Sequence, residues 1–243
     1  MRHIDVEIHP NVLDRGHSAP VGEGSWAFEH VRGSAADLHG LDPLAATGGR
    51  RVAVLEVERP ALVLGSTQRD DVADRAALGT AGVELVRRRS GGGAVLLVPG
   101  DSLWVDVVVP RDDPLWEDDV GRAARWLGRT WAAALGALGL AATAHEGGVV
   151  RTRWSSLVCF AGWAPGEVAV AGRKAVGVAS RRSRGGARFQ CGLGRTWDPA
   201  PVLDLLALDP RERAEGRHDL ADAAIGVDRP PGEVVSALRR YLP

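Results

Sequence analysis

The chain has 243 residues, 45% of them hydrophobic, and can bury a sizeable core in one large domain. Its net charge of -1 excludes a partner held mainly by bulk attraction to phosphate, because nucleic-acid binders usually carry a basic excess. With two cysteines, no signal-peptide pattern and no apolar run near the ~20 residues of a membrane span, we expect a cytoplasmic protein with reduced thiols and neither nucleic-acid nor membrane partners.

The first half of the chain predicts helices and strands that follow a polar lead-in. Residues 1–24 are rich in His, Pro and Gly, and we expect a loosely ordered segment there, followed by a single domain over 25–243. Hydrophobic periodicity and turn residues predict, in chain order, a helix over 25–39, strands over 51–57 and 61–65, a helix over 71–82, and strands over 83–87 and 101–110.

The second half predicts the longest helix and then mostly strands. Apolar residues recur at spacings of three and four from Val120 to Leu138, with Trp131 in the stripe, which is typical of a helix packed on a core. Turn signals then separate an antiparallel set of strands from two short helices joined by a charged linker. The predicted strands cover 156–160, 166–172, 174–180 and 187–193, and the helices cover 201–208 and 232–241. The pattern indicates the α/β (α+β) class, with a mixed, largely antiparallel sheet flanked by helices.

Residues 87–95 read RRRSGGGAV and follow directly on a predicted strand. Three consecutive glycines allow backbone N–H groups to surround an anion, and neighbouring arginines add contacts to phosphate. The stretch is not a Walker A loop, which needs Gly-Lys-Ser/Thr after the last glycine. Two interpretations remain open, a cradle for a nucleotide phosphate and a flexible surface turn.

Lys174 is the only lysine among 30 basic residues. In a GC-rich genome arginine replaces lysine wherever any positive charge suffices, so the survivor could be accidental. Alternatively Lys174 stands where arginine cannot serve, because a compact ammonium on a flexible stem follows a moving charge better than a planar guanidinium does. Composition alone leaves both explanations open.

The order of these motifs resembles the lipoate–protein ligase A and octanoyltransferase family, whose catalytic domain is shared with biotin–protein ligases. The matching stretches are residues 58–68, 86–95, 159–182 and 187–193. The resemblance implies a catalytic domain of the class II synthetase type with a bound acyl-adenylate. It assigns the nucleotide-binding role to Arg88, Ser90, Gly91, Gly92, Gly93, Ala94, Val95, Leu96 and Gly177. Lys174 would contact both the acyl carbonyl and the α-phosphate.

The same resemblance implies an ATP-dependent lipoate–protein ligase, with Mg²⁺ accompanying ATP. Lipoate would become lipoyl-adenylate, and a lysine of a carrier domain would then accept the lipoyl group. The expected carriers are the lipoyl domains of 2-oxoacid dehydrogenase complexes or the glycine cleavage H protein. The strands at 103–109 and 174–180 could form the walls of an apolar tunnel for the acyl chain. No spacing of His residues predicts a metal site built by the protein itself.

Two departures from the family pattern stand out. Leu97 occupies the place of a histidine that usually follows the GGGAV motif, so that imidazole is either missing or supplied elsewhere. We also expect no large C-terminal accessory domain of the kind that longer ligases have and that some members recruit as a separate protein. A separate accessory protein is therefore a further possible partner.

Two other functions stay open. Cys159 precedes Phe160 about where one octanoyltransferase branch has its nucleophile, so Cys159 would carry octanoate, taken from an acyl carrier protein, as a thioester. The alternative for Cys159 is a small apolar residue without chemistry. A non-catalytic sensor of acyl or nucleotide ligands is the third possibility. The basic tract at 181–188 would solvate a strand turn or meet an acidic carrier.

Overall fold

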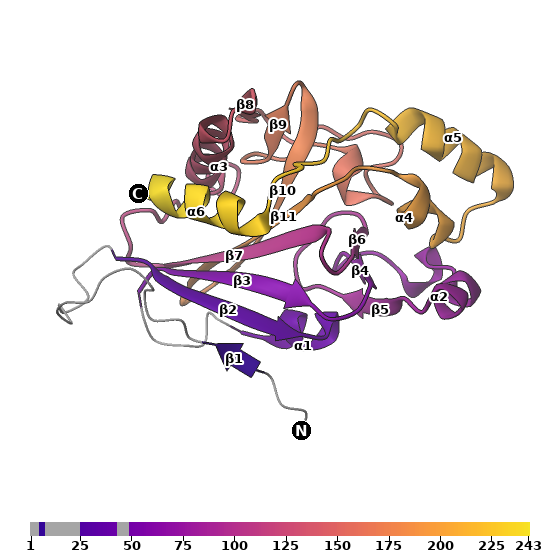
Figure 1. The fold of residues 1–243 in the computed structure, drawn as a ribbon, viewed down its shortest axis with the longest axis horizontal. Coiled ribbons are helices and arrows are strands. Elements are labelled where there is room, and N and C mark those ends of the chain that lie inside the picture. Colours follow the sequence, from indigo (N-terminus) through magenta and orange to yellow (C-terminus); the bar gives the residue numbers. More distant parts are fainter. Residues whose placement is uncertain (1–4, 8–24, 43–48) are drawn as a thin grey trace.

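The structure, a computed structural model, describes residues 5–7, 25–42 and 49–243 (Figure 1). The expected loose lead-in lies outside these residues except for 5–7, which form an edge strand. Within the described residues, no helix is long and apolar enough to cross a membrane.

The described residues form eleven strands, six α-helices and two short 3₁₀ turns. The strands are β1 (Asp5–Glu7), β2 (Ala27–Gly33), β3 (Arg51–Val57), β4 (Ala61–Leu64), β5 (Glu84–Arg87), β6 (Val95–Leu97), β7 (Ser102–Pro110), β8 (Ala142–Ala144), β9 (Val168–Val170), β10 (Arg173–Ser183) and β11 (Gly186–Gly194). The helices are α1 (Ala35–Gly40), α2 (Arg75–Ala81), α3 (Arg125–Ala137), α4 (Ala200–Asp204), α5 (Pro210–Leu220) and α6 (Pro231–Tyr241), and the 3₁₀ turns are η1 (Asp70–Val72) and η2 (Cys159–Ala161).

The strands make two sheets. The larger has the order β1-β2-β3-β7-β11-β10-β9-β8 and the smaller has the order β5-β4-β6. Among the described strands, β2 with β3 and β4 with β5 pair in parallel, and the other pairs are antiparallel. The predicted mixed, largely antiparallel sheet flanked by helices is confirmed. The predicted strands at 51–57 and 61–65 also exist, but β3 and β4 belong to different sheets.

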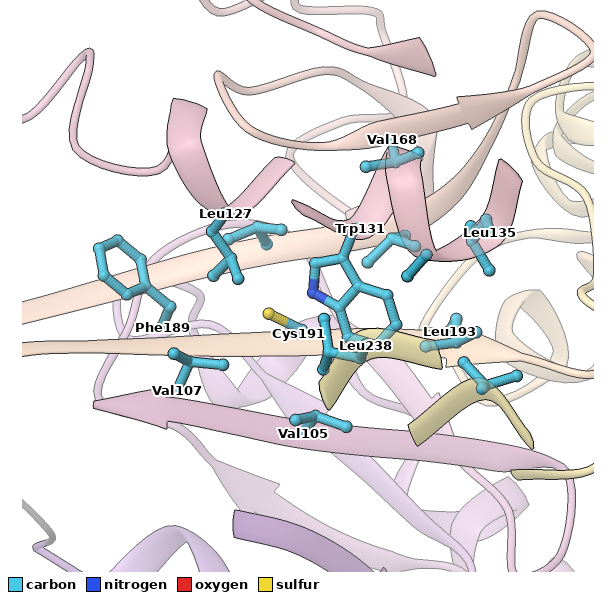
Figure 2. Close-up of a cluster of buried hydrophobic side chains, with 14 of the residues drawn as sticks. Val105, Val107, Leu127, Trp131, Leu135, Val168, Phe189, Cys191, Leu193 and Leu238 are labelled. Atoms are coloured by element: carbon cyan, nitrogen blue, oxygen red, sulfur yellow. The ribbon is translucent and has the colours of Figure 1, made fainter. Parts of the chain in front are cut away.

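Helices α3 and α6 cover one face of the larger sheet (Figure 1). Trp131 of α3 is fully buried there and lies among Cys191 of β11, Val105 of β7 and Leu238 of α6 (Figure 2). The predicted apolar stripe of this helix therefore packs in the core over most of its length. It begins later than predicted, because α3 starts at Arg125 and Val120 is exposed on the preceding turn.

Helix α1 and the smaller sheet pack on the opposite face of the larger sheet. Trp104, which alternates with Val105 along β7, joins Leu38 of α1 and Val63 of β4 in this second cluster. Strand β7 is thus buried on both faces. A third cluster joins the smaller sheet to α2, α4 and α5.

Three predicted elements are wrong. Residues 27–33 form β2 and not the start of a helix, because the segment pairs with β3 along its whole length and Ser34 then caps α1. The predicted strand at 156–160 is mostly a turn, with η2 at its end and a single bridge at Val158. The charged linker contains helix α5, whose capping box pairs Asp209 with Glu212.

Candidate functional site

Lys174 lies near the start of β10, between two different neighbours. Its backbone pairs with Ala169 of β9 on one side. On the other side its N–H donates to the carbonyl of Ala223 at 3.2 Å, and its carbonyl accepts from the N–H of Ile225 at 2.9 Å. The ladder with β9 shifts register between Lys174 and Val176. Pairing with β9 on one side and backbone hydrogen bonds on the other fix the direction in which the Lys174 side chain leaves the strand.

The ammonium of Lys174 is enclosed by acceptors and is 1% exposed. Its Nζ lies 2.7 Å from Oε1 of Glu167 and donates to the carbonyls of Cys159 at 2.9 Å and Gly162 at 3.1 Å. The ring of Phe160 lies 5.2 Å from Nζ. Three acceptors and an aromatic face therefore hold a single positive charge in place.

Glu167 pairs with Lys174 and lies in the candidate site, and the sequence analysis did not single it out. Its carboxylate is 3% exposed and accepts hydrogen bonds from the backbone N–H groups of Ala164 at 2.8 Å and Val178 at 3.4 Å. Burial raises the pKa of Glu167, although the Lys174 ammonium and the backbone donors oppose that rise. The sequence did contain a signal for Glu167, which is the single Glu inside the apolar run 166–172. A Glu in such a run is expected to be buried, and a buried Glu almost always has a pairing partner.

The side chain of Arg88 forms hydrogen bonds with the backbone of the triple-glycine loop. The buried guanidinium of Arg88 donates to the carbonyls of Val63 at 3.2 Å, Gly91 at 2.7 Å and Gly93 at 2.8 Å. In the structure Arg88 thus holds the loop. The expected contact of Arg88 with a nucleotide would have to act through the loop backbone.

The loop is packed tightly enough to require glycine at two positions. A Cβ on Gly93 would lie 2.6 Å from the carbonyl carbon of Val158, and Gly92 has a φ of 99°. Directly after the loop, the N–H of Ala94 donates to Leu157 at 2.7 Å and its carbonyl accepts from the N–H of Cys159 at 2.9 Å. This pairing places Cys159 beside the loop. Because the N–H of Ala94 already donates to Leu157, this N–H cannot bind a phosphate. In the predicted phosphate cradle, the N–H groups that remain free are those of the glycines.

One cleft of about 420 Å³ joins the loop to the lysine. Its lining includes Gly91 and Gly92 on one side, Glu167 and Lys174 at the floor, and the half-buried Cys159. Ser180 of β10 also lines the cleft. The geometry brings a cation, a glycine loop and a thiol into a single space.

A second cavity of about 320 Å³ lies on the other side of Phe160. Val95 and Leu96, which pair with β4, line it together with Trp197, whose ring centroid lies 5.5 Å from that of Phe160. Asp101 also lines this cavity, but one of its oxygens accepts from the side chain of Thr196 at 2.9 Å. No group of three or more His, Cys, Asp or Glu side chains in the described residues could hold a metal ion.

The sequence matches one family model, that of the lipoyl protein ligase A/B catalytic domain, over residues 41–226. The chain belongs to this family. No curated protein sequence matches it closely enough to count as a relative.

Solved structures of lipoate–protein ligases have the same fold. The chain is 19% identical to the bi-partite lipoate protein ligase of Thermoplasma acidophilum, which was studied with its E2 lipoyl domain, with 90% of this chain and 82% of that chain covered and a TM-score of 0.72. A lipoate–protein ligase A bound with ATP matches at 19% identity, 90% and 84% coverage and a TM-score of 0.68. Protein Ta0514 of T. acidophilum with bound lipoic acid matches at 19% identity, 90% and 84% coverage and a TM-score of 0.67.

The lipoyl ligase domain contains a third, small cavity of about 60 Å³, lined by both Leu97 and His39. Leu97 takes the place of the family histidine, and His39 of α1 brings an imidazole to the same cavity. The sequence analysis did not single out His39. Its ring centroid lies 4.2 Å from that of Trp104, and burial lowers its pKa to about 3, so the ring is neutral at pH 7. Nε2 of His39 has no hydrogen-bond partner among the described residues.

The remaining residues that the sequence analysis singled out lie in different parts of the lipoyl ligase domain. Ser90 is buried and donates through its hydroxyl to Oε1 of Gln190 at 2.9 Å, and Gln190 lines the small cavity together with His39. Gly177 lies beside Phe160 and Lys174, because a Cβ there would come within 3.6 Å of either side chain. Cys191 is fully buried, and burial raises the pKa of its thiol to about 12. Cys191 is therefore an uncharged core residue.

Proposed function

We propose that the chain is a lipoate–protein ligase that activates lipoate with ATP and transfers the lipoyl group to a carrier domain. The supporting observation is the single buried ammonium of Lys174 at the floor of the cleft that also contains Gly91 and Gly92. Membership of the lipoyl ligase family and the fold shared with an ATP-bound ligase are consistent with it.

In the first step a carboxylate oxygen of lipoate attacks the α-phosphorus of ATP. The new P–O bond forms as the bond to pyrophosphate breaks, and pyrophosphate leaves with the electron pair. Negative charge grows on the phosphate oxygens in the transition state. A preorganised ammonium at Lys174, backed by N–H groups of the glycine loop, stabilises that charge more than it stabilises the ground state.

In the second step the neutral ε-amine of a carrier lysine attacks the acyl carbonyl. The C–N bond forms, AMP leaves with the electron pair of the C–O bond, and the amine loses a proton to solvent. The positive charge of Lys174 would stabilise the negative charge on the carbonyl oxygen and on the departing phosphate during this step, while its N–H donors stay bonded to Glu167, Cys159 and Gly162. The relative studied with an E2 lipoyl domain supports a lipoyl domain of a 2-oxoacid dehydrogenase complex as the carrier, and the glycine cleavage H protein is the other candidate.

We assign the nucleoside to the cavity lined by Val95 and Leu96, and the acyl chain to the cleft and the small cavity beyond Cys159. Because the described residues offer no metal-ligand cluster, Mg²⁺ would arrive on the phosphates of ATP, and no step above depends on a protein ligand to it. Residues 25–243 would act as one catalytic domain, with an accessory protein as a possible partner.

The test is lipoate-dependent exchange of pyrophosphate into ATP. Wild type should catalyse it, and Lys174→Ala should lose it. Lys174→Arg should also be strongly impaired, because a guanidinium does not fit the compact site formed by Glu167, Cys159 and Gly162. Absence of exchange with carrier domain and candidate accessory proteins present would reject the ligase step.

A second candidate, an ATP-independent octanoyltransferase, is favoured by the position of Cys159. Cys159 lines the cleft, and its carbonyl accepts from Nζ of Lys174. The thiolate would attack the thioester of an octanoyl carrier protein and expel the carrier thiol, and a lysine amine would then displace Cys159 to form the amide. Octanoyl carrier protein should then add octanoyl mass to Cys159, and Cys159→Ser should abolish transfer. Tight binding of acyl-adenylate without turnover in either assay would instead support a sensor.

A further inference from the structure

Three exposed valines surround the mouth of the cleft that holds Lys174. The described residues include four exposed large hydrophobic side chains: Val120, Val149, Val150 and Tyr241, exposed by 66%, 63%, 47% and 42%. Val120, Val149 and Val150 all line the cleft, and Tyr241 does not. Single exposed apolar residues are ordinary on protein surfaces, but their clustering at one opening indicates a contact surface.

The backbone under this rim is already in place. Val150 and Trp163 exchange two backbone hydrogen bonds, each 2.9 Å long. The same loop is joined to the floor of the cleft, because the N–H of His145 donates to the carbonyl of Glu167 at 2.7 Å. A preformed rim costs little ordering entropy when a partner binds.

The depth of the cleft explains why a partner has to contact the rim. Lys174 and Glu167 are almost fully buried at the floor, and the valines are largely exposed at the opening. In the proposed reaction a carrier lysine must reach the acyl group held next to Lys174. The protein that carries this lysine therefore has to approach the valines closely.

One positive charge at the rim lacks a partner. Arg151 follows Val150 directly, is exposed, lines the cleft and makes no hydrogen bond or ion pair with any described residue. Arg129 and Arg153, by contrast, are paired with Glu146 at 3.0 Å and Glu215 at 2.8 Å. The charge complementary to the rim is therefore an acidic side chain of the partner.

We propose that Val120, Val149, Val150 and Arg151 form the docking surface for the lysine-bearing carrier domain, an inference that rests on the proposed function. The carrier lysine enters the mouth of the cleft. Apolar side chains beside that lysine contact the valines, and an acidic side chain contacts Arg151.

The experiment compares two acceptors on the same enzyme. Lipoyl-adenylate is trapped by hydroxylamine in one assay and transferred to an apo lipoyl domain in the other. Val149→Asp and Arg151→Glu should each lower kcat/KM for the lipoyl domain about tenfold relative to hydroxamate formation, because contacts at the centre of an interface have effects of this size. Tyr241→Asp is the matched control, with the same new charge at an exposed apolar position away from the cleft, and should leave the ratio unchanged.

An unchanged ratio in both rim variants would overturn the docking surface. If wild type forms no hydroxamate, the proposed function fails. The docking surface is then tested separately, by measuring how tightly the apo lipoyl domain binds to wild type and to each of the three variants. Binding that is weakened in the rim variants and retained in Tyr241→Asp supports the surface. Equal binding by all four proteins, or binding by none, rejects it.

Discussion

At the floor of the cleft, Glu167 is the one carboxylate among the described residues that pairs with Lys174. A buried charge is costly unless it is paired. The pair thus sets a negative charge beside a lysine that is 1% exposed. We interpret Glu167 as a positioning residue, since it acts on substrate only through Lys174.

Glu167→Gln should lower the rate of pyrophosphate exchange. Glutamine keeps the size and one acceptor but removes the negative charge beside Lys174, so the ammonium is held less firmly in place. We expect kcat for pyrophosphate exchange to fall about tenfold with little change in KM, because the lost interaction acts in the transition state. Glu146→Gln, which breaks an exposed pair with Arg129, should leave both constants unchanged. An equal kcat for wild type and Glu167→Gln would contradict the role.

His39 should make the protein sensitive to acid. Its pKa of about 3 in the fold lies below the ordinary value of 6.5, so the unfolded chain binds more protons between these limits. The free energy of unfolding should then fall as pH drops from 6.5, by up to about 1.4 kcal/mol per pH unit from this group. Urea unfolding at several pH values should show a smaller acid loss in His39→Gln than in wild type. His30→Gln, at a half-buried histidine of β2, is the control variant.

The sequence singled out the glycine loop and Lys174, which line one cleft of the structure, but not the buried residues Glu167 and His39. The glycine loop and Lys174 could be recognised because a run of glycines and a lone lysine are signals within a short stretch of sequence. Glu167 and His39 act through contacts between distant elements, and the sequence alone does not reveal which buried polar residue faces which. The predicted roles of Arg88 and Ser90 in binding nucleotide remain proposals, and the visible contacts of both residues are with the protein itself.

At the scale of elements, the pairing of residues 94 and 157–159 joins the glycine loop to the turn that carries Cys159. Predicting this pairing was difficult, because it consists of one bridge between segments some 60 residues apart. Strand β2 was missed for a similar reason. It pairs in parallel with β3 across an intervening helix, and its polar residues Glu29, His30 and Arg32 do not mark a buried strand.

Gly93→Ala should disrupt the loop, and Gly91→Ala should not. The new Cβ of Gly93→Ala would lie 2.6 Å from the backbone of Val158, whereas a Cβ on Gly91 meets nothing within 4 Å. We expect Gly93→Ala to lose pyrophosphate exchange and to unfold about 2 kcal/mol more easily, a value typical of overpacking at a buried contact. Gly91→Ala should keep its unfolding midpoint. Equal midpoints for the two variants would contradict the close approach.

At the scale of the molecule, a buried ion pair joins the layers on one face of the larger sheet. Arg188 of β11 contacts Asp106 of β7, with Nε donating to Oδ2 at 2.6 Å, and donates to the carbonyl of Leu41 after α1 at 2.8 Å. Burial raises the pKa of Asp106 to about 6, against the opposing effect of the Arg188 guanidinium. At pH 8 the carboxylate is ionised and compensates the buried arginine.

Asp106→Asn should therefore be strongly destabilising at pH 8. Removing one partner leaves the Arg188 charge buried without compensation, which costs about 3–5 kcal/mol. Urea unfolding measures the loss. Asp228→Asn breaks an exposed pair with Arg195 and should barely move the midpoint, because solvent screens such pairs. A small effect of Asp106→Asn would show that Arg188 finds other support.

The backbone bonds of Lys174 to Ala223 and Ile225 also bear on biosynthesis. Both of these partners are translated some fifty codons after the lysine itself. A nascent polypeptide that has emerged from the ribosome only as far as β11 contains the glycine loop, Glu167 and Lys174, yet it cannot complete the strand that holds the amine. Competence for chemistry would then arise only after residues 223–225 have left the exit tunnel.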